Sequence, residues 1–226
     1  MPTSLKPHRF NFFEDLPPDA WRDECPALSV VEFDDKKTVY LQGEACNSFF
    51  LIVDGHVKLS RVNRQGGEFT SALMAKGELF GPASYHQNEA QETATAKGSA
   101  RLYRIPTSDF KALLARRPAL AWRVIQALSG RQEFLERKLE CLLFDEVRER
   151  VAETLLDLSG HYSGKCVHGF ELDIHVTQQE LADLVGASRP VVSTILNDFR
   201  DQGILAYTRD HICVIRLEAL ERLLSR

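Results

Sequence analysis

The spacing of hydrophobic and polar residues changes once along the chain, from a period typical of strands to one typical of helices. Between residues 28 and 105, apolar runs such as 49–53 and alternating runs such as 56–61 are separated by glycine-containing turns such as 65–67. Several short strands at this spacing predict an antiparallel β-barrel or roll. The first half of the chain is therefore expected to be a β domain.

After residue 106 the pattern becomes helical. Thr107 or Ser108 can cap a short helix to about residue 115, and Pro118 follows it. Residues 119–142 then form a long stretch with Gly130 as its one weak point. Apolar residues recur in this stretch at intervals of three, four or seven, which predicts a long helix with an apolar stripe. The stripe consists of Leu120, Val124, Leu128, Leu135, Leu139 and Leu142.

This apolar stripe has two interpretations that periodicity does not separate. The helix packs on its own domain, or it pairs with the same helix of a second copy of the chain. The second interpretation is favoured by the nearly heptad spacing and by a helix longer than one β-roll can cover. In that case the dimer contacts are expected at Leu120, Val124, Leu128, Leu135 and Leu139.

The remainder of the chain predicts a small domain of short helices that ends in a strand pair. A second amphipathic helix is expected over residues 145–158, followed by a loop over 159–169 that is rich in Gly, His and Ser. The fold class is therefore α+β, with a jelly-roll-like β-roll, a central helix and a C-terminal helical domain. We expect the β-roll with flanking short helices over residues 1–118, the central dimerisation helix over 119–143 and the third segment over 144–226.

The most informative segment begins at Thr177. Thr177 and Glu180 have the spacing of a capping box, in which each side chain accepts from the backbone amide of the other residue, so a helix begins here. Gly186 stands where a tight turn needs a positive φ, and Ser188 can cap a second helix with Pro190 in its first turn. Two helices crossing on a short turn also need small and aliphatic residues at fixed offsets. Those positions hold Ala182, Val192 and Ile195, so the segment predicts a helix-turn-helix.

The second of these helices is the expected DNA reader. Its inward face is formed at helical spacing by Val192, Ile195, Leu196 and Phe199. Its outward residues, the two cap regions and the tip of a hairpin predicted over residues 203–215 are candidates for DNA contact. These candidates are Thr177, Gln178, Ser188, Arg189, Pro190, Ser193, Thr194, Asn197, Arg200, Arg209 and His211. Arg189, near the N-terminal end of the helix, can offer two donors to guanine O6 and N7.

Composition is that of an ordinary globular protein, and overall charge gives no support for nucleic-acid binding. The 226 residues are 44% hydrophobic and 27% charged, with a net charge of −4. From residue 141 onwards, nine Lys and Arg stand against fourteen Asp and Glu. No apolar run approaches the roughly 18 residues of a membrane span, and no signal-peptide pattern is present, so we expect a cytoplasmic protein. The five scattered cysteines indicate no disulfide framework.

Five segments carry a resemblance to a known family. Residues 42–44, 50–55 and 77–81 are similar to the β-roll signature of the CRP/FNR family of bacterial transcription regulators. Residues 177–181 and 185–189 are similar to its helix-turn-helix signature. The resemblance implies a homodimer joined along the central helix, a sensory β-roll, and a winged helix that binds palindromic promoter DNA and works with RNA polymerase. By the same resemblance the effector pocket is expected at Gly77, Glu78, Phe80, Gly81, Pro82, Glu92 and Thr93.

The effector pocket is also where the sequence departs from this family. Members that bind cyclic AMP have a Glu for the ribose and an Arg-Ser pair for the phosphate, whereas this chain has Pro82, Glu92 and Thr93 at those positions. A carboxylate in place of the guanidinium repels a phosphate in a partly buried pocket. We therefore expect no cyclic AMP binding.

No other cofactor, metal site or catalytic motif is predicted. Cys25 and Cys46 cannot supply the four closely spaced thiolates of an iron-sulfur cluster. His86 is the one candidate haem ligand, although a surface loop histidine is the favoured interpretation. Three histidines and a cysteine between residues 161 and 175 have no standard zinc spacing. Residues 160–166 miss the phosphate-loop pattern by one spacer residue and by a Cys in place of Ser or Thr, so an enzyme is not expected.

Two functions remain to be compared. The first is a sequence-specific transcription regulator that binds palindromic DNA as a homodimer under control of an unidentified signal at the β-roll. The alternative is a ligand-sensing β-roll whose C-terminal domain mediates protein contacts, and its only support is the acidic balance of that domain. Arg189 at the start of a capped helix favours the first, because a protein-contact module has no need of an outward arginine there.

Overall fold

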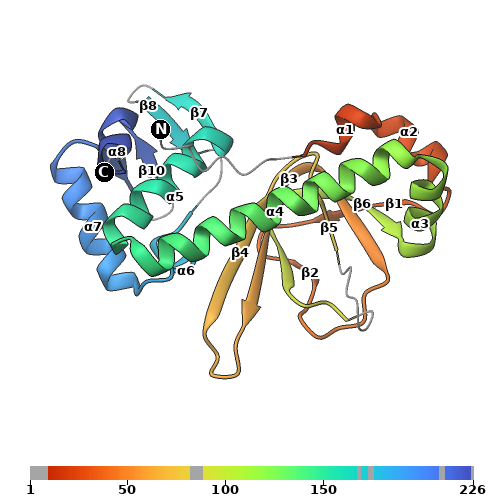
Figure 1. Cartoon of the computed structure of the whole chain (residues 1–226), viewed down its shortest axis with the longest axis horizontal. Coiled ribbons are helices and arrows are strands. Elements are labelled where there is room, and N and C mark those ends of the chain that lie inside the picture. Colours follow the sequence, from red (N-terminus) through yellow and green to blue (C-terminus); the bar gives the residue numbers. More distant parts are fainter. Residues whose placement is uncertain (1–9, 82–88, 167–168, 173–175, 209–211, 225–226) are drawn as a thin grey trace. The chain divides into compact units, whose positions relative to one another are not determined.

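The computed structural model describes residues 10–81, 89–166, 169–172, 176–208 and 212–224, with the backbone alone over the described part of 160–175. Contacts divide the chain into two compact units, His8–Gly130 and Arg131–Arg226. The division falls inside helix α4 (Pro118–Phe144). The domain boundaries predicted from the sequence, after residues 118 and 143, instead lie near the two ends of this helix. One continuous helix thus contributes its first half to one unit and its second half to the other. Each unit is described by itself, with elements labelled as in Figure 1.

The N-terminal unit is the expected antiparallel β-roll with short helices on either side of it in the sequence. The sheet has the strand order β1-β6-β3-β4, while β2 pairs with β6 and β5 pairs with β3. The two longest strands, β3 and β6, pair along most of their length and are interrupted by bulges. The elements are α1 (Phe12–Asp15), α2 (Pro18–Glu24), β1 (Ser29–Phe33), β2 (Thr38–Tyr40), β3 (Ser48–Val62), β4 (Glu68–Met74), β5 (Leu79–Phe80), β6 (Thr93–Pro106) and α3 (Thr107–Arg116).

Strand β3 separates two hydrophobic cores, which explains its continuous apolar run. Successive side chains of a strand point to opposite faces. Phe50 and Ile52 therefore enter the core inside the roll, while Leu51 enters a second core on the other face. That second core also holds Trp21 of α2 and Leu113 of α3, so the short helices cover a face of the sheet that would otherwise expose apolar residues to water.

The first turns of α4 belong to this second core, which corrects part of the predicted dimer surface. Leu120 is only 3% exposed, and Val124 packs against the same cluster. Leu120 is therefore a contact within the N-terminal unit and is not available to a second copy, whereas Val124 is only half-buried. The apolar residues that α4 exposes in this unit are Trp122, Ile125 and Leu128.

The C-terminal unit combines a helix-turn-helix with a four-stranded antiparallel sheet of order β7-β8-β10-β9. After the end of α4 come α5 (Val147–Tyr162), β7 (Ser163–Cys166), β8 (Gly169–Leu172), α6 (Gln178–Val185), α7 (Arg189–Asp201), β9 (Leu205–Tyr207), β10 (Ile212–Val214) and α8 (Leu217–Leu223). The hairpin of β9 and β10 is the predicted wing. No helix in the described part of the chain has both the length and the apolar character needed to cross a membrane.

The predicted loop over residues 159–169 is wrong. Helix α5 continues to Tyr162, and β7 and β8 form a hairpin over most of the remaining positions. Strand β8 is held by β10, which pairs Cys213 with Glu171 and Val214 with Phe170. Because the partner strand lies some forty residues further along the chain, the local Gly, His and Ser composition carries no sign of this pairing. Helix α8, after the wing, was also missed.

Candidate functional site

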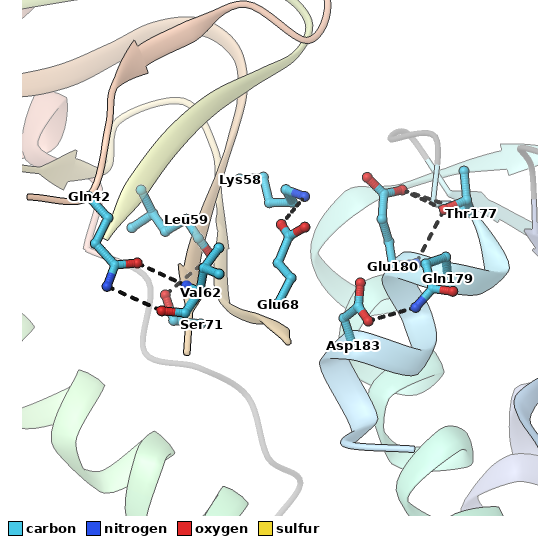
Figure 2. Close-up of polar contacts among 10 residues, drawn as sticks. All are labelled: Gln42, Lys58, Leu59, Val62, Glu68, Ser71, Thr177, Gln179, Glu180 and Asp183. Carbon is cyan, nitrogen blue, oxygen red and sulfur yellow. Dashed lines mark hydrogen bonds and ion pairs between the residues drawn. The ribbon is translucent and has the colours of Figure 1, made fainter. Parts of the chain in front are cut away.

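The helix-turn-helix begins with a complete capping box. The Thr177 hydroxyl accepts from the Glu180 backbone amide at 3.2 Å, and a Glu180 carboxylate oxygen accepts from the Thr177 amide at 2.9 Å (Figure 2). One turn further along the helix, the Gln179 side-chain amide donates to Asp183 at 2.8 Å. The helix ends at Gly186, whose φ of 65° and ψ of 44° are the left-handed values the turn was expected to need. These local bonds fix where α6 starts and stops.

The two helices cross over a buried, largely apolar core. Buried residues come from both helices and include the predicted small residue Ala182. The predicted inward face of α7 is buried at three positions, while Ile195 is half-buried. The fully buried members of this core are Leu181, Ala182, Val192, Leu196 and Phe199.

Helix α5 holds both helices of the motif through two arginines. Arg148 forms an ion pair with Asp198 of α7, and its guanidinium lies 4.7 Å from the centre of the Phe199 ring. The hydrogen bond from Arg148 lowers the pKa of the Asp198 carboxyl. Arg150 donates to the backbone carbonyl of Val185 at the end of α6 at 3.0 Å. These contacts position α7 without using any of the predicted DNA-binding residues.

The predicted DNA-binding residues that the structure describes fall into two environments. Ser188, Arg189, Pro190, Thr194 and Arg200 are exposed, whereas Thr177, Gln178, Ser193 and Asn197 are half-buried. Arg209 and His211 lie outside the described residues. Within the part of the chain that the structure describes, Arg189 makes no hydrogen bond or ion pair with the protein, and it stands at the first position of α7. Its five donors are therefore available to a ligand.

Ser188 differs from its expected role as a side-chain cap. It occupies the N-cap position of α7 with extended backbone angles, but its hydroxyl makes no cap hydrogen bond. An N-cap side chain ordinarily accepts from the second or third amide of the helix. Here the second position is Pro190, which has no N–H to donate.

Two of the predicted DNA contacts are engaged by the wing. The Tyr207 hydroxyl of β9 donates to Asn197 Oδ1 at 2.7 Å. The Arg200 guanidinium lies 5.8 Å from the centre of the Tyr207 ring and also pairs with Asp201 at 3.1 Å. Asn197 and Arg200 therefore join α7 to the wing, a role that helical spacing alone did not reveal.

One exposed residue of α7, Val191, is not among the predicted DNA-binding residues. Val191 is 44% exposed, although it stands beside fully buried Val192. The spacing of the inward residues places Val191 outside the buried face. This spacing is the sequence signal that could have identified Val191 as an outward residue. An apolar side chain on a recognition helix can contact the methyl group of thymine.

In the β-roll, the positions expected to bind an effector are engaged with the protein itself. A Glu92 carboxylate oxygen lies 3.0 Å from the Ser71 hydroxyl, which also lies 3.2 Å from the Leu59 carbonyl oxygen. The Thr93 hydroxyl accepts from the Gln42 backbone amide at 3.0 Å. Ser71 is the extra residue of a β-bulge, because Leu59 pairs with Ala72 and the next pair joins residues 60 and 70. The bulge brings this hydroxyl to the carboxylate of Glu92.

The side chain of Gln42 secures the neighbouring strand end. Its carbonyl oxygen accepts from the Val62 amide at 2.9 Å, and its amide nitrogen lies 3.4 Å from the Val62 carbonyl oxygen (Figure 2). Across the hairpin of β3 and β4, Lys58 and Glu68 form an ion pair at 2.7 Å, and hydrogen bonding by Lys58 lowers the pKa of the Glu68 carboxyl (Figure 2). The strands around Glu92 are thus held in place by side chains that act across the sheet.

The other four described pocket residues form the turn and strand that precede the undescribed residues 82–88, which include Pro82 and His86. Glu78 accepts from the Ala75 amide at 2.6 Å, and Phe80 stacks on Phe50 with ring centres 5.4 Å apart. A Cβ on Gly77 would lie 2.0 Å from the Asn11 side chain, and one on Gly81 would lie 2.9 Å from the Ser48 carbonyl. Both glycines are therefore required by close packing, whatever the effector.

One group of possible metal ligands occurs among the described residues. Cys141, Asp145 and Glu153 bring three ligand atoms within 4.8 Å of one another. The thiol of Cys141 donates to Glu153 at 3.1 Å. Burial and the two carboxylates raise the pKa of Cys141, so the thiolate that a metal needs is disfavoured. The residues between 161 and 175 that were considered for zinc have no described side chains.

Comparison with known proteins matches both parts of the chain. Residues 30–117 match the cyclic nucleotide-binding domain family, and residues 149–223 match the Crp-like helix-turn-helix domain. The cyclic AMP receptor protein of Thermus thermophilus is 33% identical over 170 residues, which are 75% of this chain and 76% of that protein. The global nitrogen regulator of Synechococcus elongatus is 29% identical over 201 residues, which are 88% of this chain and 90% of that protein.

Solved structures agree with these sequence matches. A CRP-family transcriptional regulator of Thermus thermophilus superimposes with a TM-score of 0.74 at 26% identity, covering 87% of this chain and 97% of the other. A CooA mutant from Carboxydothermus hydrogenoformans gives 0.77 over 97% and 98%, and its 22% identity supports the fold alone. The chain thus has a cyclic-nucleotide-type β-roll followed by a Crp-like helix-turn-helix, and three quarters of it aligns with a relative at 33% identity. The protein therefore belongs to the CRP/FNR family, whose members regulate transcription and are not enzymes.

Proposed function

We propose that this regulator binds palindromic promoter DNA as a homodimer, with α7 in the major groove. The observation that carries the proposal is Arg189, which is exposed, has no described partner and stands at the N-terminal end of a helix that Arg148 of α5 holds in place. That end of a recognition helix supplies most base contacts. Arg189 can pair two donors with guanine O6 and N7, so each half-site contains a guanine at this place.

The dimer forms through the exposed apolar residues of α4. In the N-terminal unit these include Ile125 and Leu128, and in the C-terminal unit Leu135, Leu139 and Leu142. Their spacing of three, seven, four and three residues is that of a two-stranded coiled coil. Two copies related by a two-fold axis then present two recognition helices to a palindromic site.

The β-roll receives a signal other than cyclic AMP. Glu92 stands at the place where cyclic AMP-binding members have an arginine, and its carboxylate is held by Ser71. An anionic phosphate there would meet a negative charge that is only partly exposed to water. The effector is therefore not an anionic phosphate. The change in transcription that follows effector binding is transmitted through contact with RNA polymerase in the cytoplasm.

The test is selection of bound fragments from random DNA, followed by binding measurements with arginine variants. Arg189→Ala should lose preference for the selected site over a scrambled one by about 5- to 150-fold, the range for one bidentate base contact. Arg189→Lys keeps the charge but loses the planar pair of donors, so it should lose the same preference while retaining affinity for scrambled DNA. Arg209→Ala, by contrast, should weaken both DNAs equally.

Equal losses on the selected and scrambled DNA for Arg189→Ala would mean that Arg189 only holds phosphate. Recovery of no preferred sequence by the wild-type protein, with and without a cell extract as a source of effector, would contradict sequence-specific binding altogether.

A further inference from the structure

Helix α7 carries an apolar patch beside Arg189. Pro190, Val191 and Thr194 are all exposed, and Val191 and Pro190 precede Thr194 by three and four residues. Residues at these spacings are neighbours on a helix surface. The three side chains therefore form one patch on the N-terminal half of the recognition helix.

The hydroxyl of Thr194 has no proton free for a ligand. Its Oγ1 donates to the backbone carbonyl of Pro190 at 3.0 Å, so its only proton is used inside the helix. Pro190 has no N–H, and Val191 has a hydrocarbon side chain. The side chains of the patch consequently offer carbon atoms and no free hydrogen-bond donor to a ligand.

The major groove presents one apolar group, the 5-methyl group of thymine. If the patch covered a base-edge acceptor such as guanine O6 or N7 instead, that acceptor would lose water without gaining a donor, which is unfavourable. We propose that Pro190, Val191 and Thr194 read thymine methyl groups next to the guanine that faces Arg189. This inference rests on the proposed function and specifies the base sequence that the same surface recognises.

The size of the patch limits how many base pairs it reads. Residues 190–194 rise about 6 Å along the helix axis at 1.5 Å per residue. That length spans roughly two base steps of 3.4 Å. Each half-site should therefore contain one or two thymines whose methyl groups contact the patch.

The experiment replaces each thymine of the selected half-site in turn by deoxyuridine, which lacks only the methyl group. At one or two positions beside the guanine, the Kd of the wild-type protein should rise about fourfold per methyl, the factor expected for burying one such group. Deoxyuridine at the other thymines should leave the Kd unchanged. The absence of an effect at every thymine of a site that the protein does select would overturn the inference and leave the proposed function standing.

Two substitutions of Thr194 separate its methyl group from its hydroxyl. Thr194→Val keeps the methyl and removes the hydroxyl, so it should retain the preference for thymine over deoxyuridine. Thr194→Ser keeps the hydroxyl and removes the methyl. At the base pair that residue 194 contacts, the ratio of the Kd for deoxyuridine DNA to the Kd for thymine DNA should therefore fall towards one. Val191→Ala should act like Thr194→Ser at its own base pair. Loss of binding by Thr194→Val with normal binding by Thr194→Ser would show that the hydroxyl reads a polar base edge, and the inference would be wrong.

Affinity for scrambled DNA and melting temperature serve as controls for folding, because all three side chains are exposed. A wild-type protein that selects no site would overturn the proposed function and this inference together, whereas the other outcomes concern the patch alone.

Discussion

The hydroxyl of Tyr207 donates a hydrogen bond to Asn197 Oδ1 at 2.7 Å. Tyr207 ends strand β9 of the wing, and Asn197 lies in the second half of α7. The bond therefore joins two elements that are consecutive in the chain but separated by a turn. Since this side-chain oxygen already has a partner, Asn197 is expected to support the geometry of the interface more than to read a base.

Tyr207→Phe should lower the free energy of unfolding of the C-terminal unit by about 1 kcal/mol, the usual value of one such hydrogen bond. Asn197→Ala should have a similar effect, and the double variant should be less destabilised than the sum of the two, measured by denaturant unfolding. Both variants should weaken cognate and scrambled DNA equally. A loss confined to cognate DNA for Asn197→Ala would return this residue to the base-reading set.

Gly186→Ala should destabilise the helix-turn-helix for two reasons. The left-handed backbone at φ +65° costs a residue with a Cβ about 1 to 2 kcal/mol. The new Cβ would also lie 2.9 Å from Cδ2 of Leu142 at the end of α4, so that side chain has to move. We expect a lower melting temperature and weaker DNA binding, measured by calorimetry and by titration with the selected site.

Gly203→Ala is the matched control for this substitution. Gly203 has the same φ of +65°, but the nearest atom to its Cβ would be Arg216 Nη2 at 3.7 Å, an ordinary contact. It should show the backbone penalty alone. Measured in a Leu142→Ala background, which removes the contact from both proteins compared, Gly186→Ala should cost no more than Gly203→Ala does in the wild type, and a larger cost would exclude the contact with Leu142 as the cause.

Leu128 and Leu135 should be required for dimerisation. Both are exposed on α4, and burying either at an interface is favourable by about 1.5 to 3 kcal/mol. Replacing both by Glu should yield monomers by light scattering, because two buried negative charges would face their copies across the two-fold axis. Replacement of both by Met, which keeps the apolar volume, should leave the dimer intact. A dimer that persists with both glutamates would mean that another surface forms the main interface.

Cyclic AMP should change neither the melting temperature nor DNA affinity. A ligand that binds only the folded protein, present at 100 times its Kd, would stabilise it by about 2.7 kcal/mol. Glu92 opposes such binding by its charge and by its bond to Ser71. A clear rise in melting temperature with millimolar cyclic AMP would contradict this prediction. Glu92→Arg is the variant expected to move the site towards accepting a phosphate.

Lys138 should make the C-terminal unit less stable near neutral pH than in mild alkali. Burial lowers the pKa of Lys138 to about 8, against the opposing charge of Asp157. The unfolded chain, with a lysine pKa of about 10.4, therefore binds more protons between these two values, and stability rises with pH across that window. Below about pH 8 both states are protonated and the whole penalty is present.

Lys138→Met removes this penalty. At pH 7 it should raise the melting temperature by about 4 to 8 °C for each 1 kcal/mol of this penalty, the shift expected in a domain of this size. The difference from the wild type should shrink as the pH approaches 10. A constant difference across pH 7–10 would show that packing of the methionine, and not the lysine charge, is responsible.

Local rules determined much of this protein from its sequence. The capping box at Thr177 needs only a partner three residues away, and the turn at Gly186 needs only a residue that tolerates positive φ. The buried positions of α7 follow from helical periodicity. In each case the interacting groups lie within a few residues of one another, so the sequence contains all the necessary information.

The tertiary structure alone decided which side chains meet across long separations. Strands β7 and β8 exist because β10 pairs with β8, and Leu120 is buried because the short helices of the N-terminal unit form a core around it. Likewise, Glu92 meets Ser71 only because a bulge shifts the register of β4. A one-residue change in register moves a side chain to the other face of a sheet, and nothing in the local pattern specifies that register.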